Sequence, residues 1–311
     1  MKTCGIFHSF AGHWQLIAEA LRLKTVWYYE NEPKTRQIIE NNRPELNIID
    51  DASEIEKVDI IMGSPPCVGM SQANPKACIE HPANIEMFKF SEAVAMLQPE
   101  YFFMEMVPTI TQKRFSSLYN KLLKTFKQTH KTLVKTFNYK DYKVPQSRKR
   151  VFFYGNTKRY IPWPEKIGES NIREAFKGLP NYSRKEAIDN KLAIRIKPKW
   201  KGPYSMLEKK PEYFYLDWDG ISPTVTALGT MYFRHPDRHR RITYREAARL
   251  MEFPDNYSFE PHSLSMKFRD VGWGVPILGT AKILYKILNY DILNKDEFEK
   301  LLIKKSISDY F

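Results

Sequence analysis

The chain has 311 residues, of which 42% are hydrophobic and 27% are charged, values close to those of ordinary globular proteins. A core of useful size can therefore form, which excludes a disordered tail and a small protein held together by disulfides. Lys and Arg outnumber Asp and Glu by 49 to 36, giving a net charge of +13.

The cysteines and the lack of a long apolar run predict an intracellular protein. Cys4, Cys67 and Cys78 show no paired spacing, which favours a reducing compartment over a disulfide framework. The first residues are too poor in apolar side chains for a signal peptide, and no run of about 18 apolar residues would span a membrane. We therefore expect a cytoplasmic protein without a membrane partner.

Strands and helices alternate over the first half of the chain. Short apolar strands are expected at residues 4–10, 25–29, 58–62, 101–104 and 151–154, and helices at 14–21, 34–42, 88–97 and 115–126. This alternation predicts an α/β fold with a doubly wound, mostly parallel sheet. Ligands bind beyond the carboxyl ends of the strands in such sheets, where Phe10, Glu30, Cys67 and Glu105 fall.

The charge is unevenly distributed along the chain. Residues 1–110 contain 9 Lys and Arg against 15 Asp and Glu, whereas residues 111–160 contain 14 against one. This asymmetry indicates one face for a small ligand and another for a polyanion. Lys121, Lys124 and Lys127 lie in the basic segment, where a solvated helix face is an equally good interpretation.

The alternating pattern stops near residue 160. Seven prolines between residues 162 and 223 separate short aromatic pieces that are too irregular for the sheet. Helical patterning returns at Thr243, which has Glu246 three residues later as in a capping box, and again at residues 275–288. We predict a first domain at residues 1–160, a smaller loop-rich domain at 161–238, and a C-terminal segment at 239–311 that returns to the first domain.

One group of side chains at the predicted sheet edge suits nucleophilic chemistry. Pro65 and Pro66 fix the backbone before Cys67, and Glu105 ends the next strand. Arg148 and Arg150 open the strand after the basic segment. A lone cysteine is more often a small core residue, but a thiol, a carboxyl and two arginines together suit attack on a planar, electron-poor ring.

These residues belong to motifs that resemble those of the DNA cytosine-5 methyltransferases, in the family's order and over nearly the whole chain. Phe10-Ala11-Gly12 is similar to the cofactor loop, Pro65-Pro66-Cys67 to the catalytic motif, and Glu105-Met106-Val107 to the Glu-Asn-Val motif. Glu30 is similar to the family's ribose-binding acid, Asp51 to the acid near the adenine, and Asp59 to the start of the strand that leads to the catalytic loop. Further matches are Gln146-x-Arg148-x-Arg150, Ser222-Pro223-Thr224-Val225-Thr226 and residues 241–255.

The resemblance implies a Rossmann-like domain that transfers a methyl group from S-adenosylmethionine to carbon 5 of a cytosine flipped out of double-stranded DNA. It implies that Cys67 adds to carbon 6, Glu105 protonates ring nitrogen 3, and Arg150 holds the 2-carbonyl while Arg148 supports the loop. The implied cofactor-binding residues are Phe10, Ala11, Gly12, Glu30, Asn31, Asp51, Ala52, Pro66, Trp273, Gly274 and Val275.

The same resemblance implies how DNA is bound and which partner accompanies the protein. The expected DNA-binding residues are Gln146, Thr224, Lys121, Lys124 and Lys127, and residues 160–230 would read the bases as a target-recognition domain. A cognate restriction endonuclease acting on the same site is a possible partner, and no metal site is expected.

Three residues depart from the family pattern. Trp14 replaces a glycine of the cofactor loop, Met106 replaces the Asn of Glu-Asn-Val, and Trp273 lies in the last motif. Either the loops are reshaped around a cofactor that still binds, or the cofactor site is weakened. Two alternative functions therefore stay open: a DNA-binding or regulatory homologue that has lost methyl transfer, and an RNA cytosine-5 methyltransferase, although the Cys-Phe-Thr signature of the tRNA-directed relatives is not found.

Overall fold

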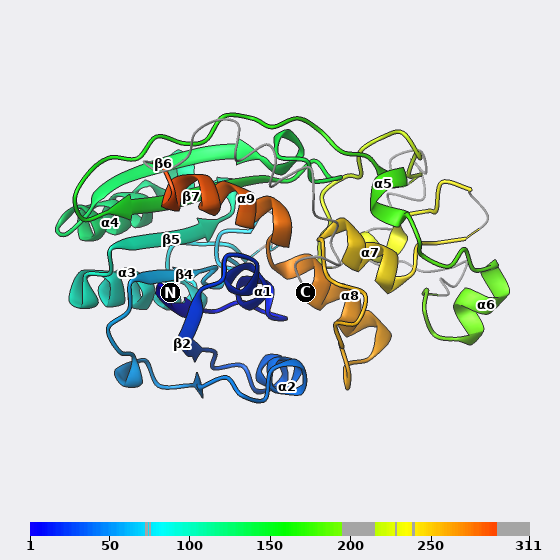
Figure 1. Cartoon of the computed structure of the whole chain (residues 1–311), viewed down its shortest axis with the longest axis horizontal. Coiled ribbons are helices and arrows are strands. Elements are labelled where there is room, and N and C mark those ends of the chain that lie inside the picture. The colour runs from blue at the N-terminus through cyan, green and yellow to red at the C-terminus, as the bar shows by residue number, and fades with distance from the viewer. Residues whose placement is uncertain (72–73, 75, 195–214, 228, 238–239, 291–311) are drawn as a thin grey trace. The chain divides into compact units, whose positions relative to one another are not determined.

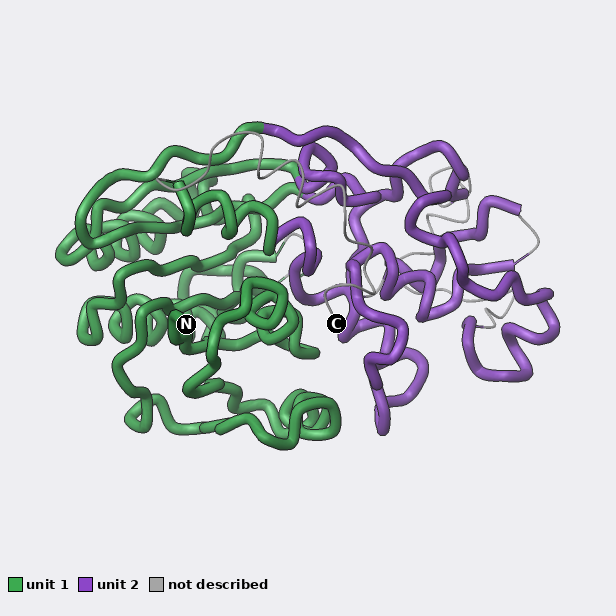
Figure 2. Tube along the Cα trace, viewed as in Figure 1, with its two compact units in different colours: residues 1–138, 149–165, 281–311 green, residues 139–148, 166–280 purple. Residues whose placement is uncertain are grey.

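The structure is a computed structural model that describes residues 1–71, 74, 76–194, 215–227, 229–237 and 240–290 (Figure 1). The chain divides into two compact units (Figure 2). Unit 1 comprises Met1–Asn138, Lys149–Glu165 and Ala281–Phe311, and unit 2 comprises Tyr139–Arg148 and Lys166–Thr280.

Unit 1 is built on a seven-stranded sheet, counted over the described residues, with the strand order β3-β2-β1-β4-β5-β7-β6. The strands are β1 (Thr3–Phe7), β2 (Lys24–Tyr29), β3 (Ile48–Ile49), β4 (Ile60–Gly63), β5 (Tyr101–Met106), β6 (Lys131–Asn138) and β7 (Lys149–Asn156). The pairs among β1 to β5 are parallel, and β7 is antiparallel to both β5 and β6. The predicted α/β fold with a mostly parallel sheet is confirmed.

Helices cover both faces of this sheet (Figure 1). They are α1 (His13–Ala20), α2 (Pro33–Asn42), α3 (Ile85–Leu97) and α4 (Ser116–Lys127). The connection from β1 to β2 runs toward one side of the sheet, and the connection from β4 to β5 runs toward the other. Because such crossovers are right-handed, α1 lies on one face of the sheet, and α3 and α4 lie on the other. Helix α3 ends at Leu97 because Gln98 adopts a left-handed φ of 46° and Pro99 cannot continue the helix.

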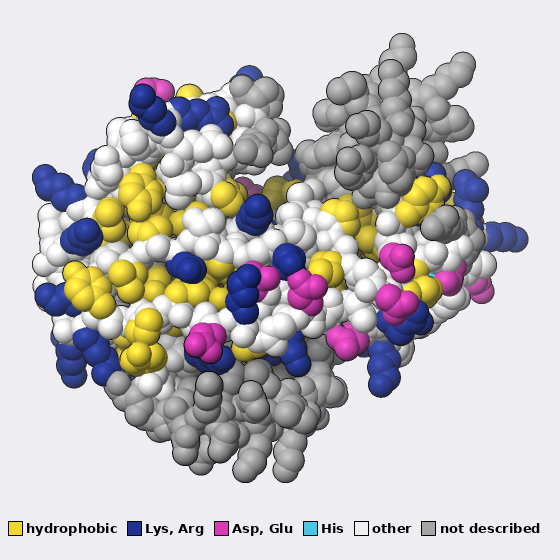
Figure 3. All heavy atoms as spheres, turned by 90° about the horizontal axis from the view of Figure 1, so that it is seen from above, with side chains coloured by type: hydrophobic (Ala, Val, Ile, Leu, Met, Phe, Trp, Pro, Cys, Tyr) yellow, Lys and Arg dark blue, Asp and Glu magenta, His cyan; other side chains and the backbone are white. Residues whose placement is uncertain are grey.

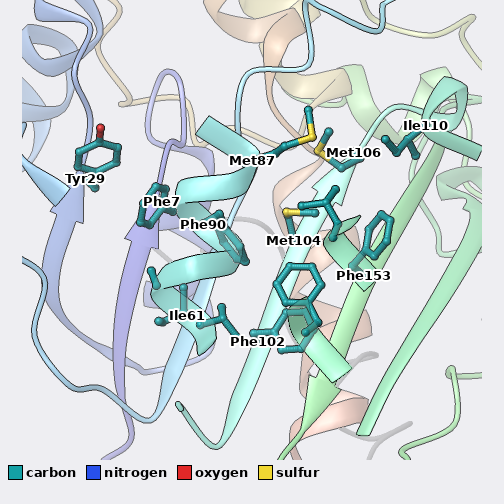
Figure 4. Packing of buried hydrophobic residues seen from close by; sticks show 14 of the residues in the cluster. Phe7, Tyr29, Ile61, Met87, Phe90, Phe102, Met104, Met106, Ile110 and Phe153 are labelled. Carbon is teal, nitrogen blue, oxygen red and sulfur yellow. The ribbon is translucent and has the colours of Figure 1, made fainter. Parts of the chain in front are cut away.

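The main hydrophobic core of unit 1 lies between the sheet and helices α3 and α4. Phe90 of α3 and Phe102, Met104 and Met106 of β5 are fully buried there (Figure 4). Phe102 also stacks on Phe126 of α4 with ring centroids 4.3 Å apart. The core thus fixes β5, which carries Glu105, against two helices.

One glycine allows β4 to approach β1 closely at the carboxyl edge of the sheet. A Cβ atom on Gly63 would lie 1.9 Å from the backbone oxygen of Phe7, a distance that no side chain can accept. The strand that leads to Cys67 therefore ends in a residue without a side chain.

Unit 2 contains four helices within the described residues: α5 (Ile172–Phe176), α6 (Arg184–Asp189), α7 (Tyr244–Leu250) and α8 (Leu264–Trp273). The predicted capping box of α7 is confirmed, since Thr243 accepts from the backbone N–H of Glu246 and Glu246 accepts from that of Thr243. The Glu246 carboxylate also receives two hydrogen bonds from the buried guanidinium of Arg240, at 2.7 and 2.8 Å.

One stretch is long and apolar enough to cross a membrane by length and composition alone. It covers Leu264–Leu288, with a mean hydropathy of 1.2, and includes α8 and the final helix α9 (Ile277–Leu288). Of this apolar window, 72% is buried inside the protein. Buried core helices pass the same test, so the stretch is weak support for a membrane span.

Candidate active site

The cysteine predicted as the nucleophile lies on a loop that follows β4 and is held at several points. The backbone N–H of Ser64 donates to the oxygen of His8 at 3.1 Å, and that of Met70 donates to the oxygen of Cys67 at 2.9 Å. The hydroxyl of Thr109, after β5, donates to the oxygen of Met70 at 2.6 Å. Cys67 itself is partly exposed, so the thiol sits on a fixed loop and can still meet a substrate.

Glu105 and Arg150 form an ion pair near this loop. The two side chains come from the paired antiparallel strands β5 and β7, and Arg150 Nε lies 2.7 Å from Glu105 Oε1. The exposed fractions of the side chains are only 14% and 6%, so each charge depends on the other for compensation. Since β4 and β5 are parallel neighbours in which Gly63 pairs with Met104, Cys67 and Glu105 lie at the same sheet edge.

The predicted cofactor loop begins at the carboxyl end of β1. Gly12 has a φ of 80°, a left-handed conformation that glycine adopts at little cost, and helix α1 starts at the next residue. Phe10 also has a positive φ of 52° and is partly exposed, whereas Ala11 is buried. A tight turn that leads into a helix is the usual arrangement of a loop that binds a nucleotide cofactor.

Trp14, the large residue that departs from the family's glycine, is directed into the protein. Its side chain is fully buried, and its Nε1 donates to the Ser64 hydroxyl at 2.8 Å. Its backbone N–H donates to Ser9 Oγ at 2.5 Å. The indole therefore joins the cofactor loop to the start of the cysteine loop.

The two acidic candidates for cofactor binding follow β2 and β3. Glu30 is 3% exposed, and its Oε1 accepts from the backbone N–H of Glu32 at 3.1 Å. Asp51 accepts from the backbone N–H of Ser53 at 2.8 Å, and this hydrogen bond lowers the pKa of the Asp51 carboxyl. The neighbouring candidates Asn31 and Ala52 are exposed and partly exposed, respectively.

The donor chemistry of these residues fits S-adenosylmethionine. Phe10, Glu30 and Pro66 follow the neighbouring parallel strands β1, β2 and β4 and so lie along one sheet edge. Carboxylates there can accept hydrogen bonds from ribose hydroxyls and an amino group, and the missing Cβ at Gly12 leaves room for close approach.

Within unit 2, two of the motifs found in the sequence pair with each other. The hydroxyl of Thr224 donates to the oxygen of Ser147 at 2.6 Å, and Gln146 Oε1 accepts from the backbone N–H of Val225 at 3.1 Å. Gln146 also donates to the oxygen of Leu250 at 2.6 Å and is fully buried. The Gln146 amide is thus engaged in joining three segments of unit 2, while Thr224 is partly exposed.

Arg148 is buried and binds backbone groups of unit 2. Its guanidinium is fully buried and donates to the backbone oxygens of Val225, Gly272 and Gly274. It therefore fixes the last motif, in which Val275 is buried and Trp273 is 38% exposed. The guanidinium of Arg269 lies over the Trp273 ring, 5.6 Å from its centroid.

The three lysines predicted to bind DNA lie on the exposed side of α4, opposite Leu118, Leu122 and Phe126. Helix α4 runs back from the carboxyl end of β5, and His130, just after it, lies 2.7 Å from the oxygen of Pro99 at the start of β5. Lys124 and Lys127 are therefore near the end of the sheet opposite Cys67. On the face shown in Figure 3, basic side chains are scattered among apolar and acidic ones in the coloured part of the surface.

The sequence interpretation missed two titratable residues next to Glu30. His8 directly follows strand β1 and is 2% exposed. Glu86 lies in α3 and is 7% exposed. Proximity to the cofactor loop could have signalled His8. Nothing in the sequence could have signalled Glu86, because its place depends on how α3 packs over the sheet.

Comparison with known proteins agrees with this fold. The family model of the C-5 cytosine-specific DNA methylases matches residues 1–289. The chain is 26% identical to the type II methyltransferase M.FnuDI of Fusobacterium nucleatum over 92% of this chain and 91% of that protein. It is 27% identical to the type II methyltransferase M.NgoPII of Neisseria gonorrhoeae, over 82% and 83% of the two chains.

A solved structure shows the same fold. A prophage-encoded protein of Escherichia coli superimposes with a TM-score of 0.70 at 24% identity and covers 92% of this chain and 99% of that one. The chain therefore belongs to the C-5 cytosine-specific DNA methylase family. It is a DNA (cytosine-5-)-methyltransferase family enzyme, and S-adenosylmethionine is the cofactor of this family.

Proposed function

We propose that this enzyme methylates carbon 5 of one cytosine within a specific double-stranded DNA site, as the modification half of a restriction-modification pair in the cytoplasm. The observation that carries the proposal is the placement of the Cys67 loop and the Glu105–Arg150 ion pair at one edge of the sheet. The relatives support the biological setting, since both are type II methyltransferases.

The chemistry proposed for these side chains begins with the cytosine ring. The Cys67 thiolate forms a bond to carbon 6, and Glu105 supplies a proton to nitrogen 3, so that negative charge does not build up on the ring. Arg150, which already holds Glu105 at 2.7 Å, would also donate to the 2-carbonyl. S-adenosylmethionine supplies the methyl group that carbon 5 takes. A base then removes the proton from carbon 5, the carbon–sulfur bond breaks with its electron pair going to the Cys67 sulfur, and nitrogen 3 returns its proton to Glu105.

Arg148 and Gln146 act in this proposal as positioning residues. Both are fully buried and bind backbone groups of the Val225 segment. They would keep the loops of unit 2 in place while a flipped base is bound. Reading of the DNA sequence is assigned to residues 160–230, of which residues 195–214 and 228 lie outside the described residues.

The buried position of Trp14 supports a reshaped cofactor loop that still binds S-adenosylmethionine. The indole is fully buried and hydrogen-bonded to Ser64. Met106 likewise has a packing role, since it is fully buried in the hydrophobic cluster of α3 and α4 (Figure 4). An Asn side chain there would need hydrogen-bond partners that an apolar cluster lacks. These departures are consistent with an active enzyme.

Bisulfite sequencing of DNA from cells that express the chain tests the proposed function. We expect one short DNA motif in which the same cytosine is protected from conversion at nearly every occurrence. Cells that express Cys67→Ala serve as the control and should show no protection. Methylation scattered without a common motif would contradict a site-specific modification enzyme.

A further inference from the structure

A buried histidine connects the proposed cofactor carboxylate to a second carboxylate. His8 Nδ1 lies 3.4 Å from Glu30 Oε1, and His8 Nε2 lies 3.0 Å from Glu86 Oε2. All three residues are at most 7% exposed. One imidazole ring thus lies between a carboxylate at the carboxyl end of β2 and a carboxylate on α3.

The far side of this network is fixed by two further groups. Lys89 Nζ donates to Glu86 Oε1 at 2.9 Å and to the Tyr29 hydroxyl at 3.2 Å. The Tyr29 hydroxyl in turn donates to Glu86 Oε2 at 3.3 Å. Glu86 is therefore held by α3 and β2 together, and it provides a fixed point against which the ring of His8 is oriented.

The backbone fixes His8 as well. Its N–H donates to the oxygen of Tyr29 at 3.0 Å, and its oxygen accepts from the N–H of Ser64 at 3.1 Å. His8 has a φ of 53°, a left-handed conformation that is uncommon for residues other than glycine and several-fold enriched for Asn, Asp and His. The ring can therefore be replaced by an Asn side chain without a new backbone conflict.

We propose that His8, held by Glu86, is a positioning residue that orients the Glu30 carboxylate toward the ribose of S-adenosylmethionine. The inference rests on the proposed role of Glu30 in cofactor binding. Glu30 Oε1 is engaged by His8 and by the N–H of Glu32, and no described residue donates a hydrogen bond to Oε2. A carboxylate fixed through one oxygen presents the other to a ligand in one direction.

The charges of the network agree with this arrangement. Burial lowers the pKa of His8, but hydrogen bonds to Glu30 and Glu86 outweigh it and raise the pKa to about 9. Burial raises the pKa of Glu86, but hydrogen bonds from His8 and Lys89 outweigh it and lower the pKa to about 2. His8 is therefore a cation near neutral pH and compensates the buried charge of Glu30.

The test measures binding of S-adenosylhomocysteine and of its 2′-deoxy analogue to the full chain by calorimetry. The variants are His8→Asn, Glu86→Gln and Glu30→Gln. The matched control is His130→Asn. His130 is also a buried histidine, 3% exposed, and it contacts the oxygen of Pro99 just before β5, at the end of that strand away from Glu105. Unfolding midpoints of all variants are measured, so that loss of folding is recognised.

We expect Glu30→Gln to weaken S-adenosylhomocysteine binding about tenfold or more and to reduce its preference over the 2′-deoxy analogue. His8→Asn should reduce both quantities in the same way, and Glu86→Gln should do so to a smaller extent. His130→Asn should keep the preference even if it lowers the unfolding midpoint. In the double variant of His8 and Glu30, the two effects should be less than additive, because one acts through the other.

Two outcomes separate the possible failures. If Glu30→Gln leaves binding and preference unchanged, the proposed cofactor role of Glu30 is wrong. If Glu30→Gln reduces the preference but His8→Asn does not, or if the two effects simply add, the positioning role of His8 is wrong and the cofactor site stands.

Discussion

At the scale of single residues, the charges of Glu105 and Arg150 cannot be changed independently. The two side chains are 2.7 Å apart and nearly buried, so removal of one partner leaves an uncompensated charge in the protein. The same pair is assigned to hold the cytosine ring. Stability and reaction rate are therefore linked at this position, and a double variant can separate them.

We predict that Arg150→Ala slows methyl transfer in a single turnover by about a hundredfold or more and lowers the free energy of unfolding by about 3 kcal/mol. The double variant with Glu105→Gln and Arg150→Met should recover stability but not activity, since no buried charge is left. The control is Lys135→Ala, which removes an exposed cation of β6. A normal single-turnover rate for Arg150→Ala would contradict its role.

The pKa of His8 leads to a prediction about stability and pH. The folded-state pKa is raised to about 9 from 6.5, so the stabilisation is complete below pH 6.5 and is lost as the pH rises through 9. We expect wild type to be more stable than His8→Asn at about pH 6, by up to about 3 kcal/mol, and to lose this advantage by about pH 10. Urea unfolding at both pH values measures it, and a difference that does not change with pH would contradict the charged state of His8.

The sequence predicts which side chains lie at the carboxyl ends of the strands, but it does not predict which way these side chains are directed. Cys67, Glu105 and Glu30 were predicted because carboxyl ends of parallel strands share an edge. The interior direction of Trp14 could not be predicted, since it depends on the Ser64 hydroxyl fifty positions later in the chain. The burial of Gln146 and Arg148 likewise depends on segments about eighty or more positions away.

At the scale of elements, the strands that the sequence did not predict are those with the weakest patterns. β3 has two residues, too few for a periodic signal. β6 carries Lys131 and Lys135 and lies at the edge of the sheet, where charged residues protect against edge-to-edge pairing. The apolar strands and the helix that ends before Pro99 were predicted correctly, because propensity and packing agree there.

Helix α4 gives a prediction at this scale. Lys124 and Lys127 lie toward the end of the sheet away from Cys67, which favours the interpretation of a solvated helix face. We expect replacement of Lys121, Lys124 and Lys127 by Gln to leave unchanged the slope of log binding constant against log salt concentration. Binding of a DNA duplex at several salt concentrations measures the slope. A slope reduced by about three would instead show that these lysines contact phosphates.

For the whole molecule, the proposed function requires a covalent step at Cys67. The family assignment gives the reaction class, and the partly exposed Cys67 thiol lies on a fixed loop at the same sheet edge as Glu105. A methyltransferase of this kind must form and break a carbon–sulfur bond in each turnover. This step can be arrested, because a fluorine on carbon 5 cannot leave as a proton does.

The most direct test is to incubate the protein with DNA that carries 5-fluorocytosine at the methylated position, together with S-adenosylmethionine. We predict a covalent protein–DNA complex that survives denaturation for wild type and for Cys78→Ser, whose thiol is exposed and lies outside the Pro65-Pro66-Cys67 motif. Cys67→Ser should form none, since a hydroxyl ionises far less than a thiol near neutral pH. A wild-type protein that binds this DNA and never forms the complex, at any cofactor concentration, would contradict the account.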